Sequence, residues 1–356
     1  MISREALGAY SGQVDSLARD ASAAVERAVL EWARSHPRAT PAETREAVVR
    51  LLESSIGALG EASSSLAAEW YDAMASEVQA RLPAAGASYE VPAVLIERTV
   101  RYQLGKALAG DTGGFARACG GLASECVKRS ANATVMANAG RDAKRGVRFA
   151  RVPSGAETCA FCYMLASRGA VYRTSKTAGE FDHWHRNCDC RVVPGFGDDP
   201  DAEIVEGYDP AGMRDRLHAI EGMTGLSFAE SGDLSRISEF MELLDPGWLY
   251  GGKEATVCFA SSQVEKRAGD AEVRTAKRLA SFGFSAEFIQ DYDWIVDGGR
   301  KRKVGLPDLA SGVEIKTLGT SRNPYGAIDN YLRNASGKRG LKLVAVDNCD
   351  SLFIDD

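Results

Sequence analysis

Apolar residues recur at three- and four-residue steps through residues 1–150, which is the spacing of amphipathic helices. Thr40-Pro41-Ala42-Glu43 is a helix-start signal, because Thr40 can cap the helix and Glu43 completes a capping box. One face of the helix that follows carries Leu51, Leu52, Ile56, Leu59, Leu66 and Trp70. The pattern predicts a mostly α-helical N-terminal region whose apolar stripes serve core packing or, equally, self-assembly.

The pattern changes after residue 150. Residues 151–196 lose the helical period and concentrate Cys, His, Gly and aromatic residues. Residues 197–252 are polar and carry three Asp-Pro pairs, which mark turns. We expect a Cys/His module over 151–196 and then a connector with one or two short helices, which ends at Gly251-Gly252.

Residues 253–356 are predicted to form a separate unit. In chain order, the expected elements are a helix over 262–282, strands over 286–294 and 313–318, a helix over 323–334 and a strand over 341–346. This order predicts a small α/β domain. The chain as a whole is therefore expected to be multi-domain, with a helical region over 1–150 before the other three segments.

The overall composition is that of an ordinary globular chain, with 356 residues, 45% hydrophobic residues and a net charge of −6. This acidic balance does not indicate a general nucleic-acid binder. The densest basic run, Arg300-Lys301-Arg302-Lys303, follows a Gly298-Gly299 turn and is interpreted as a solvated hairpin tip.

Hydropathy excludes a membrane span, since no stretch approaches the roughly 18 apolar residues that one needs. The first residues also lack the apolar core of a signal peptide. We therefore expect synthesis in the cytoplasm and reduced cysteines.

Four of the eight cysteines lie close together in the sequence. The spacing is Cys159-x2-Cys162, then His183-x-His185-x2-Cys188-x-Cys190. Zinc takes four thiolate or imidazole ligands in a tetrahedron, and a C-x2-C pair provides two of them from one turn. The spacing thus favours zinc, while a redox dithiol and plain buried thiols remain alternatives.

This cluster resembles the signature of phage Mu F-type head morphogenesis (minor capsid) proteins, in which C-x2-C precedes H-x2-C-x-C. The resemblance places Cys159, Cys162, His185, Cys188 and Cys190 as zinc candidates and leaves His183 outside the pattern. It implies a structural role in the virion, in contact with phage portal or capsid proteins.

The tail carries a second constellation, Pro307-Asp308 followed by Glu314-Ile315-Lys316. Alternate residues of a strand share a face, so Glu314 and Lys316 are expected on one side, where Asp308 can meet them. Two carboxylates suit Mg²⁺ or Mn²⁺, and a lysine can stabilise the charge of a phosphodiester transition state. Alternating charges also mark solvated strands, so the motif alone leaves that alternative open.

The order of helix, Pro-Asp turn, Glu-x-Lys strand and helix resembles the PD-(D/E)xK nuclease core. More narrowly, residues 262–347 resemble the tRNA-cleaving toxin domain of contact-dependent growth inhibition proteins. By position, the resemblance implies that Asp308 and Glu314 hold Mg²⁺, Lys316 is catalytic and Glu272 supports the site, with Glu265 as its rival. The family often has a Gln before its last core strand, where this chain has Lys338-Arg339.

Together these observations predict a phage or prophage head-associated toxin with a metal-dependent nuclease tail that cleaves RNA such as tRNA, or DNA. Such a protein implies a cognate immunity protein. The alternative is a structural minor capsid protein whose tail is a non-catalytic interaction domain.

Overall fold

The structure, a computed structural model, describes residues 1–154, 158–173, 190–230, 232–249, 255–319 and 323–348. The chain divides into two compact units, Met1–Leu217 and His218–Asp356. The predicted boundary at Gly251-Gly252 lies outside the described residues and stays a prediction. Among the described helices, none combines the length and apolar character that crossing a bilayer requires.

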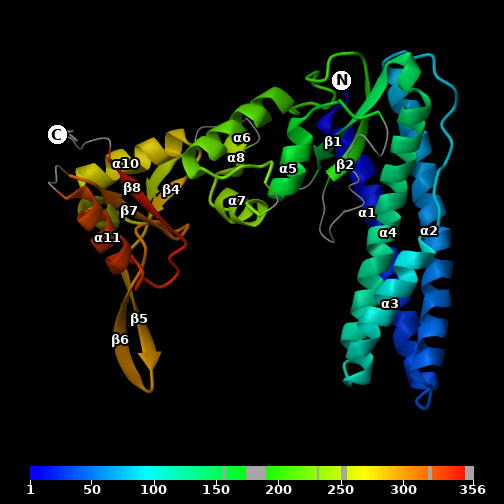
Figure 1. The fold of residues 1–356 in the computed structure, drawn as a ribbon, viewed down its shortest axis with the longest axis horizontal. Helices are drawn as coiled ribbons and strands as arrows, with labels where there is room; N and C mark the ends of the chain where they lie inside the picture. Colours follow the sequence, from blue (N-terminus) through cyan, green and yellow to red (C-terminus); the bar gives the residue numbers. More distant parts are fainter. Residues whose placement is uncertain (155–157, 174–189, 231, 250–254, 320–322, 349–356) are drawn as a thin grey trace. The chain divides into compact units, whose positions relative to one another are not determined.

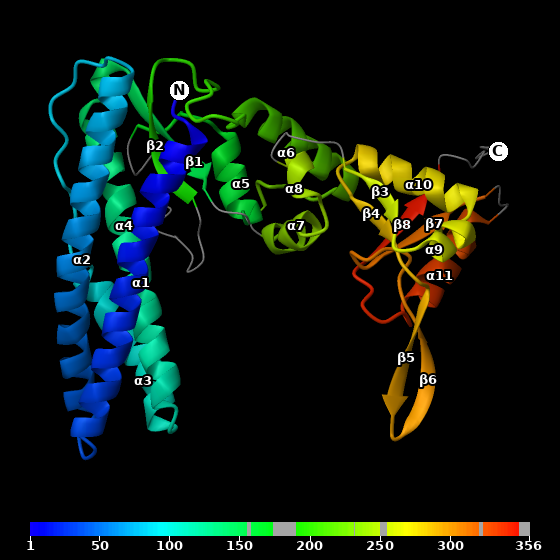
Figure 2. The ribbon, with the colours of Figure 1, turned by 180° about the vertical axis from the view of Figure 1, so that it is seen from behind.

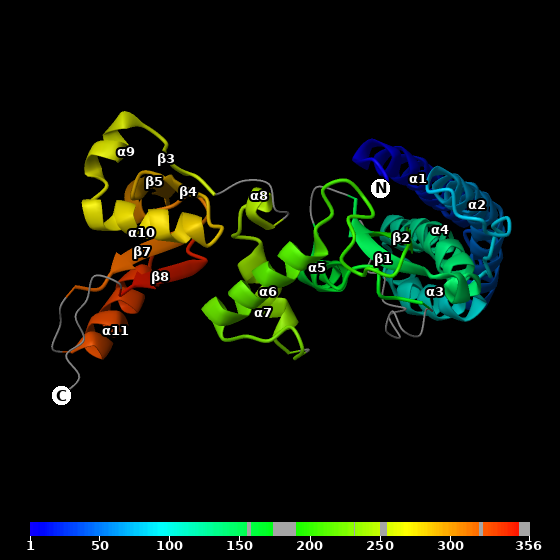
Figure 3. The ribbon, with the colours of Figure 1, turned by 90° about the horizontal axis from the view of Figure 1, so that it is seen from above.

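The N-terminal unit is built on long helices that run alongside one another (Figures 1 and 3). They are α1 (Arg4–Ser35), α2 (Pro41–Glu77), α3 (Ala93–Leu108) and α4 (Thr112–Arg141). The predicted capping box at Thr40 and Glu43 is confirmed, since each side chain accepts the other residue's backbone N–H. The hydrophobic core between the helices includes Val25, Leu52, Ile56 and Phe115.

A two-stranded sheet packs against the bundle near one end of α4. The short helix η1 (Ala143–Arg145) leads into β1 (Val147–Pro153), which pairs antiparallel with β2 (Cys190–Phe196). Between them in sequence lies α5 (Ala160–Ser167). The buried Arg191 of β2 donates to Asp15 of α1 at 2.7 Å, which ties the sheet to the bundle.

The connector contains more helix than expected. The prediction of one or two short helices was wrong, because the described part holds α6 (Pro210–Thr224), α7 (Leu234–Met241) and α8 (Pro246–Leu249). Helix α7 and the residue before α8 contact the segment that follows α10: Phe240 meets Phe284 edge to face at 5.2 Å, and Asp245 N–H donates to Gly283 O at 2.6 Å.

The rest of the C-terminal unit mixes helices and strands. Its elements are β3 (Val257–Phe259), α9 (Ser262–Arg267), α10 (Asp270–Ser281), β4 (Ala286–Phe288), β5 (Tyr292–Asp297), β6 (Arg300–Gly305), β7 (Val313–Thr317), α11 (Pro324–Ala335) and β8 (Leu343–Asp347). Among the described strands, β3–β4 and β7–β8 are parallel pairs, while β5–β6 is an antiparallel hairpin. Figure 2 shows this hairpin projecting from the unit.

Two expected elements are broken. The helix predicted over 262–282 is interrupted at Ala268-Gly269, since Gly269 caps α10 and starts a new helix. The strand predicted over 286–294 is divided between β4 and β5. The coarse prediction, a mostly helical N-terminal half followed by small mixed α/β regions, is confirmed. The described strands show pairs and no PD-(D/E)xK core.

Candidate functional site

The predicted residues Asp308, Glu314 and Lys316 come together at β7, and Lys338 joins them. We call these four residues the acid–lysine cluster. Glu314 and Lys316 lie on β7, Asp308 in the turn that precedes it and Lys338 in the loop that precedes β8. The N–H of Ile315 donates to Asp308 Oδ2 at 2.8 Å, which fixes the turn against the strand.

Two ammonium groups flank the buried carboxylate of Glu314. Lys316 Nζ lies 2.6 Å from Oε1, and Lys338 Nζ lies 2.6 Å from Oε2. Each lysine also reaches Asp308, at 3.9 Å and 3.8 Å respectively. The side chain of Glu314 is 1% exposed, so it forms the floor of the cluster, while Asp308 is 15% exposed.

The two acids differ in acidity. Burial raises the pKa of Asp308 to about 6, the Ile315 N–H acts in the opposite direction, and the negative charge of Glu314 adds to the rise. Burial would also raise the pKa of Glu314, but hydrogen bonds from Lys316 and Lys338 outweigh it and hold that pKa below its usual value. Glu314 is therefore the fixed charge, and Asp308 is the group that titrates near neutrality.

Lys316 is held in its charged form. Burial alone would lower its pKa, but the hydrogen bond to Glu314 and the charges of Asp308 and Glu272 raise it. Lys316 also donates to the carbonyl oxygen of Ile315 at 3.1 Å. A protonated amine in this position can stabilise negative charge but cannot accept a proton.

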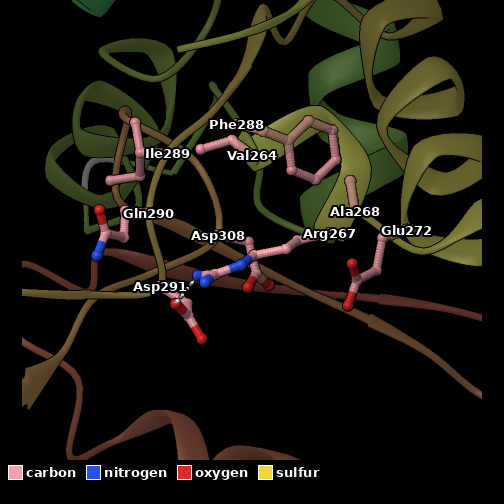
Figure 4. Close-up of a pocket in the computed structure, with 9 residues that line it drawn as sticks. All are labelled: Val264, Arg267, Ala268, Glu272, Phe288, Ile289, Gln290, Asp291 and Asp308. Carbon is pink, nitrogen blue, oxygen red and sulfur yellow. Dashed lines mark ion pairs between the residues drawn. The ribbon is translucent and has the colours of Figure 1, made fainter. Parts of the chain in front are cut away.

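Asp308 opens onto a pocket of about 160 Å³ (Figure 4). Its other charged lining residues are Arg267, Glu272 and Asp291. Arg267 Nη1 lies 3.9 Å from Asp291 Oδ1. Of the two rival glutamates, Glu272 lines the pocket, where its carboxylate also accepts the N–H of Gly269, and Glu265 does not.

The donor set fits a hard divalent cation with few protein ligands. Within the described ranges, no three acidic, histidine or cysteine side chains group closely enough to hold a metal ion. Asp308 and Glu314 offer two carboxylates, and Mg²⁺ commonly takes one or two and keeps several waters. Both oxygens of Glu314 accept from lysines, however, so metal ligation by Glu314 requires one lysine to shift.

Lys338 was not among the predicted site residues. The sequence analysis treated Lys338-Arg339 only as a departure from a family pattern. The parallel pairing of β7 with β8 brings the start of β8 beside the start of β7, and Arg339 N–H donates to Gly305 O at 2.9 Å. The sequence signal that could have identified Lys338 is its position just before the last predicted strand, provided that this strand is expected to pair in parallel with β7.

The cysteine module is described in part. Cys159, Cys162 and Cys190 pack together, and Cys159 caps α5 through its sulfur, which accepts the N–H of Cys162 at 3.4 Å. A nitrogen of Arg151 lies 3.6 Å from the sulfur of Cys162. His185 and Cys188 lie outside the described residues, so the zinc assignment stays a prediction.

The comparison with protein families concerns mainly the N-terminal unit. The model of the VG15 family, described as VG15 protein, matches residues 1–220, which is more than half of the chain. The chain belongs to the VG15 family. The resemblance to Mu F-type head morphogenesis proteins was therefore wrong, since the cysteine motif that suggested it lies inside the VG15 match.

The relatives of this VG15 protein include two phage proteins. The Gene 15 protein of Mycobacterium phage L5 is 33% identical over 14% of this chain and 29% of its own length. The Gene 15 protein of Mycobacterium phage D29 is 33% identical over 14% of this chain and 28% of its own length. The match thus spans less than a third of either relative. The localisation expectation is confirmed only in its coarser part, a phage-type protein whose described helices cannot span a membrane.

No solved structure matches the chain. The VG15 match ends at residue 220, and no comparison matches residues 262–347 to the tRNA-cleaving toxin domain, so that resemblance was wrong as well.

Proposed function

We propose that the C-terminal unit is a metal-dependent phosphodiesterase that acts on nucleic acid. The observation that carries this proposal is the acid–lysine cluster, in which two carboxylates and two ammonium groups meet beside a pocket. The four charges cancel, so a bound divalent cation would give the site an excess of positive charge. Such an excess attracts a phosphate group and stabilises its transition state.

In this proposal the carboxylates have different tasks. Asp308 faces the pocket and would hold Mg²⁺ or Mn²⁺ directly, and Glu314 would join it once a lysine shifts. The raised pKa of Asp308 supports this assignment, because a carboxylate that resists ionisation gains most from a neighbouring cation. A metal of this kind lowers the pKa of its bound water and orients the phosphate.

The lysines would act on the substrate by charge. Lys316 is the more strongly positioned of the two, since it bridges Glu314, Asp308 and the Ile315 carbonyl. Glu272 lines the pocket at the first turn of α10 and supports the site. The predicted preference for tRNA and the predicted association with the phage head and portal rested on the two resemblances, and the proposed activity does not depend on them. The predicted immunity protein follows from a nuclease made in the cytoplasm and stays a prediction.

A second candidate is a purely structural role. Both oxygens of Glu314 already accept from lysines at 2.6 Å, which is also what a closed, stabilising ion cluster looks like. In that case the tail is a non-catalytic interaction domain of a phage structural protein.

The deciding experiment is hydrolysis of tRNA, single-stranded DNA and plasmid DNA by the full chain, with Mg²⁺, Mn²⁺ or EDTA. Cutting is expected with metal only. Asp308→Asn and Lys316→Ala should each lower the rate on the order of a hundredfold, with circular dichroism unchanged.

Lys342→Ala is the matched control for Lys338→Ala, because both lysines lie between α11 and β8, but no described carboxylate pairs with Lys342. Lys338→Ala should slow cutting, and Lys342→Ala should not. If all of these variants cut as fast as the parent, or the parent cuts nothing, the structural role takes the place of the nuclease.

A further inference from the structure

The β5–β6 hairpin has two different faces. In its register, Trp294 lies opposite Lys303, Val296 opposite Lys301 and Tyr292 opposite Gly305. Directly paired residues share a face of an antiparallel ribbon. One face, which we call the aromatic–lysine face, therefore carries Tyr292, Trp294, Val296, Lys301 and Lys303, and the opposite face carries Asp293, Ile295, Asp297, Arg300, Arg302 and Val304.

The two faces differ in charge and in exposed apolar surface. The aromatic–lysine face has two lysines and no acid, while the opposite face balances two arginines with two aspartates. Trp294 is 58% exposed and Val296 is 71% exposed, although both are large apolar side chains. Among the described strands, β5 and β6 pair only with each other, so no third strand extends the hairpin. Neighbouring apolar side chains that are exposed in this way are typical of interaction sites on protein surfaces.

The aromatic rings are arranged as a platform. Tyr292 and Trp294 meet edge to face with centroids 6.5 Å apart, and Lys303 Nζ lies 3.6 Å from the centroid of Tyr292. The lysine thus covers the tyrosine and leaves the indole of Trp294 available. An exposed indole beside lysines is the combination with which proteins bind single-stranded nucleic acid, since bases stack on the ring and ammonium groups follow the phosphates.

The platform leads to the acid–lysine cluster. Gly305, at the base of the hairpin, belongs to the same face as Trp294, and a Cβ built there would lie 3.4 Å from Cγ of Lys338. The backbone of Gly305 also accepts from Arg339 N–H. Three residues after Gly305 the chain reaches Asp308, which lines the pocket. The base of the aromatic–lysine face therefore lies beside Lys338 of the acid–lysine cluster.

We propose that the aromatic–lysine face binds a single strand of nucleic acid and leads it to the acid–lysine cluster. The inference rests on the proposed nuclease function in naming its substrate class, single-stranded RNA or DNA. The basic run predicted to be a solvated hairpin tip lies on this hairpin, where residues 300–303 are the first four of β6 and are exposed. The opposite face, with its balanced charges, takes no part.

Binding can be measured apart from cutting. The full chain in EDTA is titrated into fluorescein-labelled oligo-uridine, oligo-thymidine and a mixed-sequence duplex of equal length, with anisotropy as the readout. Trp294→Ala should weaken binding of the single strands about tenfold, and Trp294→Phe should restore most of it. The duplex should bind more weakly than either strand, because its bases are already stacked.

The charge contribution has a matched control. Replacing Lys301 and Lys303 by alanine should reduce the slope of log Kd against log salt by about 1.4, since each phosphate contact on a single strand contributes about 0.7. Replacing Arg300 and Arg302 removes the same charge from the opposite face and should leave the slope nearly unchanged.

Equal losses from the two faces, or duplex binding as tight as single-strand binding, would overturn the proposal. The proposal would also be overturned if the full chain bound no single strand in EDTA and the Trp294→Ala variant still cut with Mg²⁺ at the rate of the parent. The nuclease would stand in that case. Strand binding without cutting under any metal would support the aromatic–lysine face as a binding surface and refute the nuclease instead.

Discussion

Asp308 connects stability, pH and metal binding in a way that one substitution tests. The folded chain holds its carboxyl at a pKa of about 6, against an ordinary value of 3.8. Each pH unit between these values is worth about 1.4 kcal/mol. An ionised Asp308 at pH 7 therefore lowers the free energy of unfolding by up to about 3 kcal/mol.

The direction follows from proton binding. Between pH 4 and pH 6 the folded chain holds a proton that the unfolded chain has released, so stability falls as the pH rises and levels off above the folded pKa. Glu314 changes the stability in the opposite direction, because its pKa is lowered in the folded chain. This change is confined to pH values below the ordinary pKa of a glutamate. The range from pH 5 to pH 7 therefore reports on Asp308.

Asp308→Asn removes the ionisation and keeps an oxygen to accept the Ile315 N–H. The variant should be more stable than the parent at pH 7, by up to about 3 kcal/mol, and nearly equal to it at pH 4. Mg²⁺ should stabilise the parent at pH 7 and should not stabilise the variant.

The assay is urea unfolding of the full chain. Protease cleavage within β7 reports on the unfolding of the C-terminal unit. Circular dichroism checks that both proteins start folded. A parent whose β7 stability stays constant from pH 5 to pH 7, or a variant that is no more stable at pH 7, would refute the assignment of the raised pKa to Asp308.

Two further predictions concern the N-terminal unit. Chelator-free protein should contain about one zinc per chain. Cys190→Ser should lose the zinc, while Cys258→Ser, a change at an exposed cysteine of β3, should keep it. Metal analysis that finds no zinc would contradict the thiolate site. Thr40→Ala should cost about 1 kcal/mol because it removes the capping box of α2, whereas Thr44→Ala in the same turn should cost less; equal shifts of the thermal midpoint would show that the cap is unimportant.

Local signals made part of this fold predictable. The capping box at Thr40 and the glycine turn at Gly298-Gly299 involve residues within a few positions of one another, and both are present. The break in the helix over 262–282 was also local, but the apolar period continued through Gly269 and concealed it. Periodicity shows which face is buried, and it does not show where one helix ends and the next begins.

The candidate site was also predictable only in the part that local sequence signals define. Asp308, Glu314 and Lys316 lie within nine residues and were found because a strand places alternate side chains together. Lys338 lies 24 residues from Glu314, and only the parallel pairing of β7 with β8 brings it there. The burial of Glu314 also depends on tertiary packing, so the sequence alone could not show that this acid is the floor of the site rather than part of a solvated strand.

The contacts of α7 and α8 with the segment after α10 determine where a fragment that contains the acid–lysine cluster can begin. Gly283 has a φ of +94°, and Trp248 lies so close that a Cβ there would collide with the indole. Asp245 holds the same segment through Gly283 O and the hydroxyl of Ser285. A fragment that starts at residue 253 loses both partners and exposes the base of β4, so a self-sufficient C-terminal piece has to begin before α7.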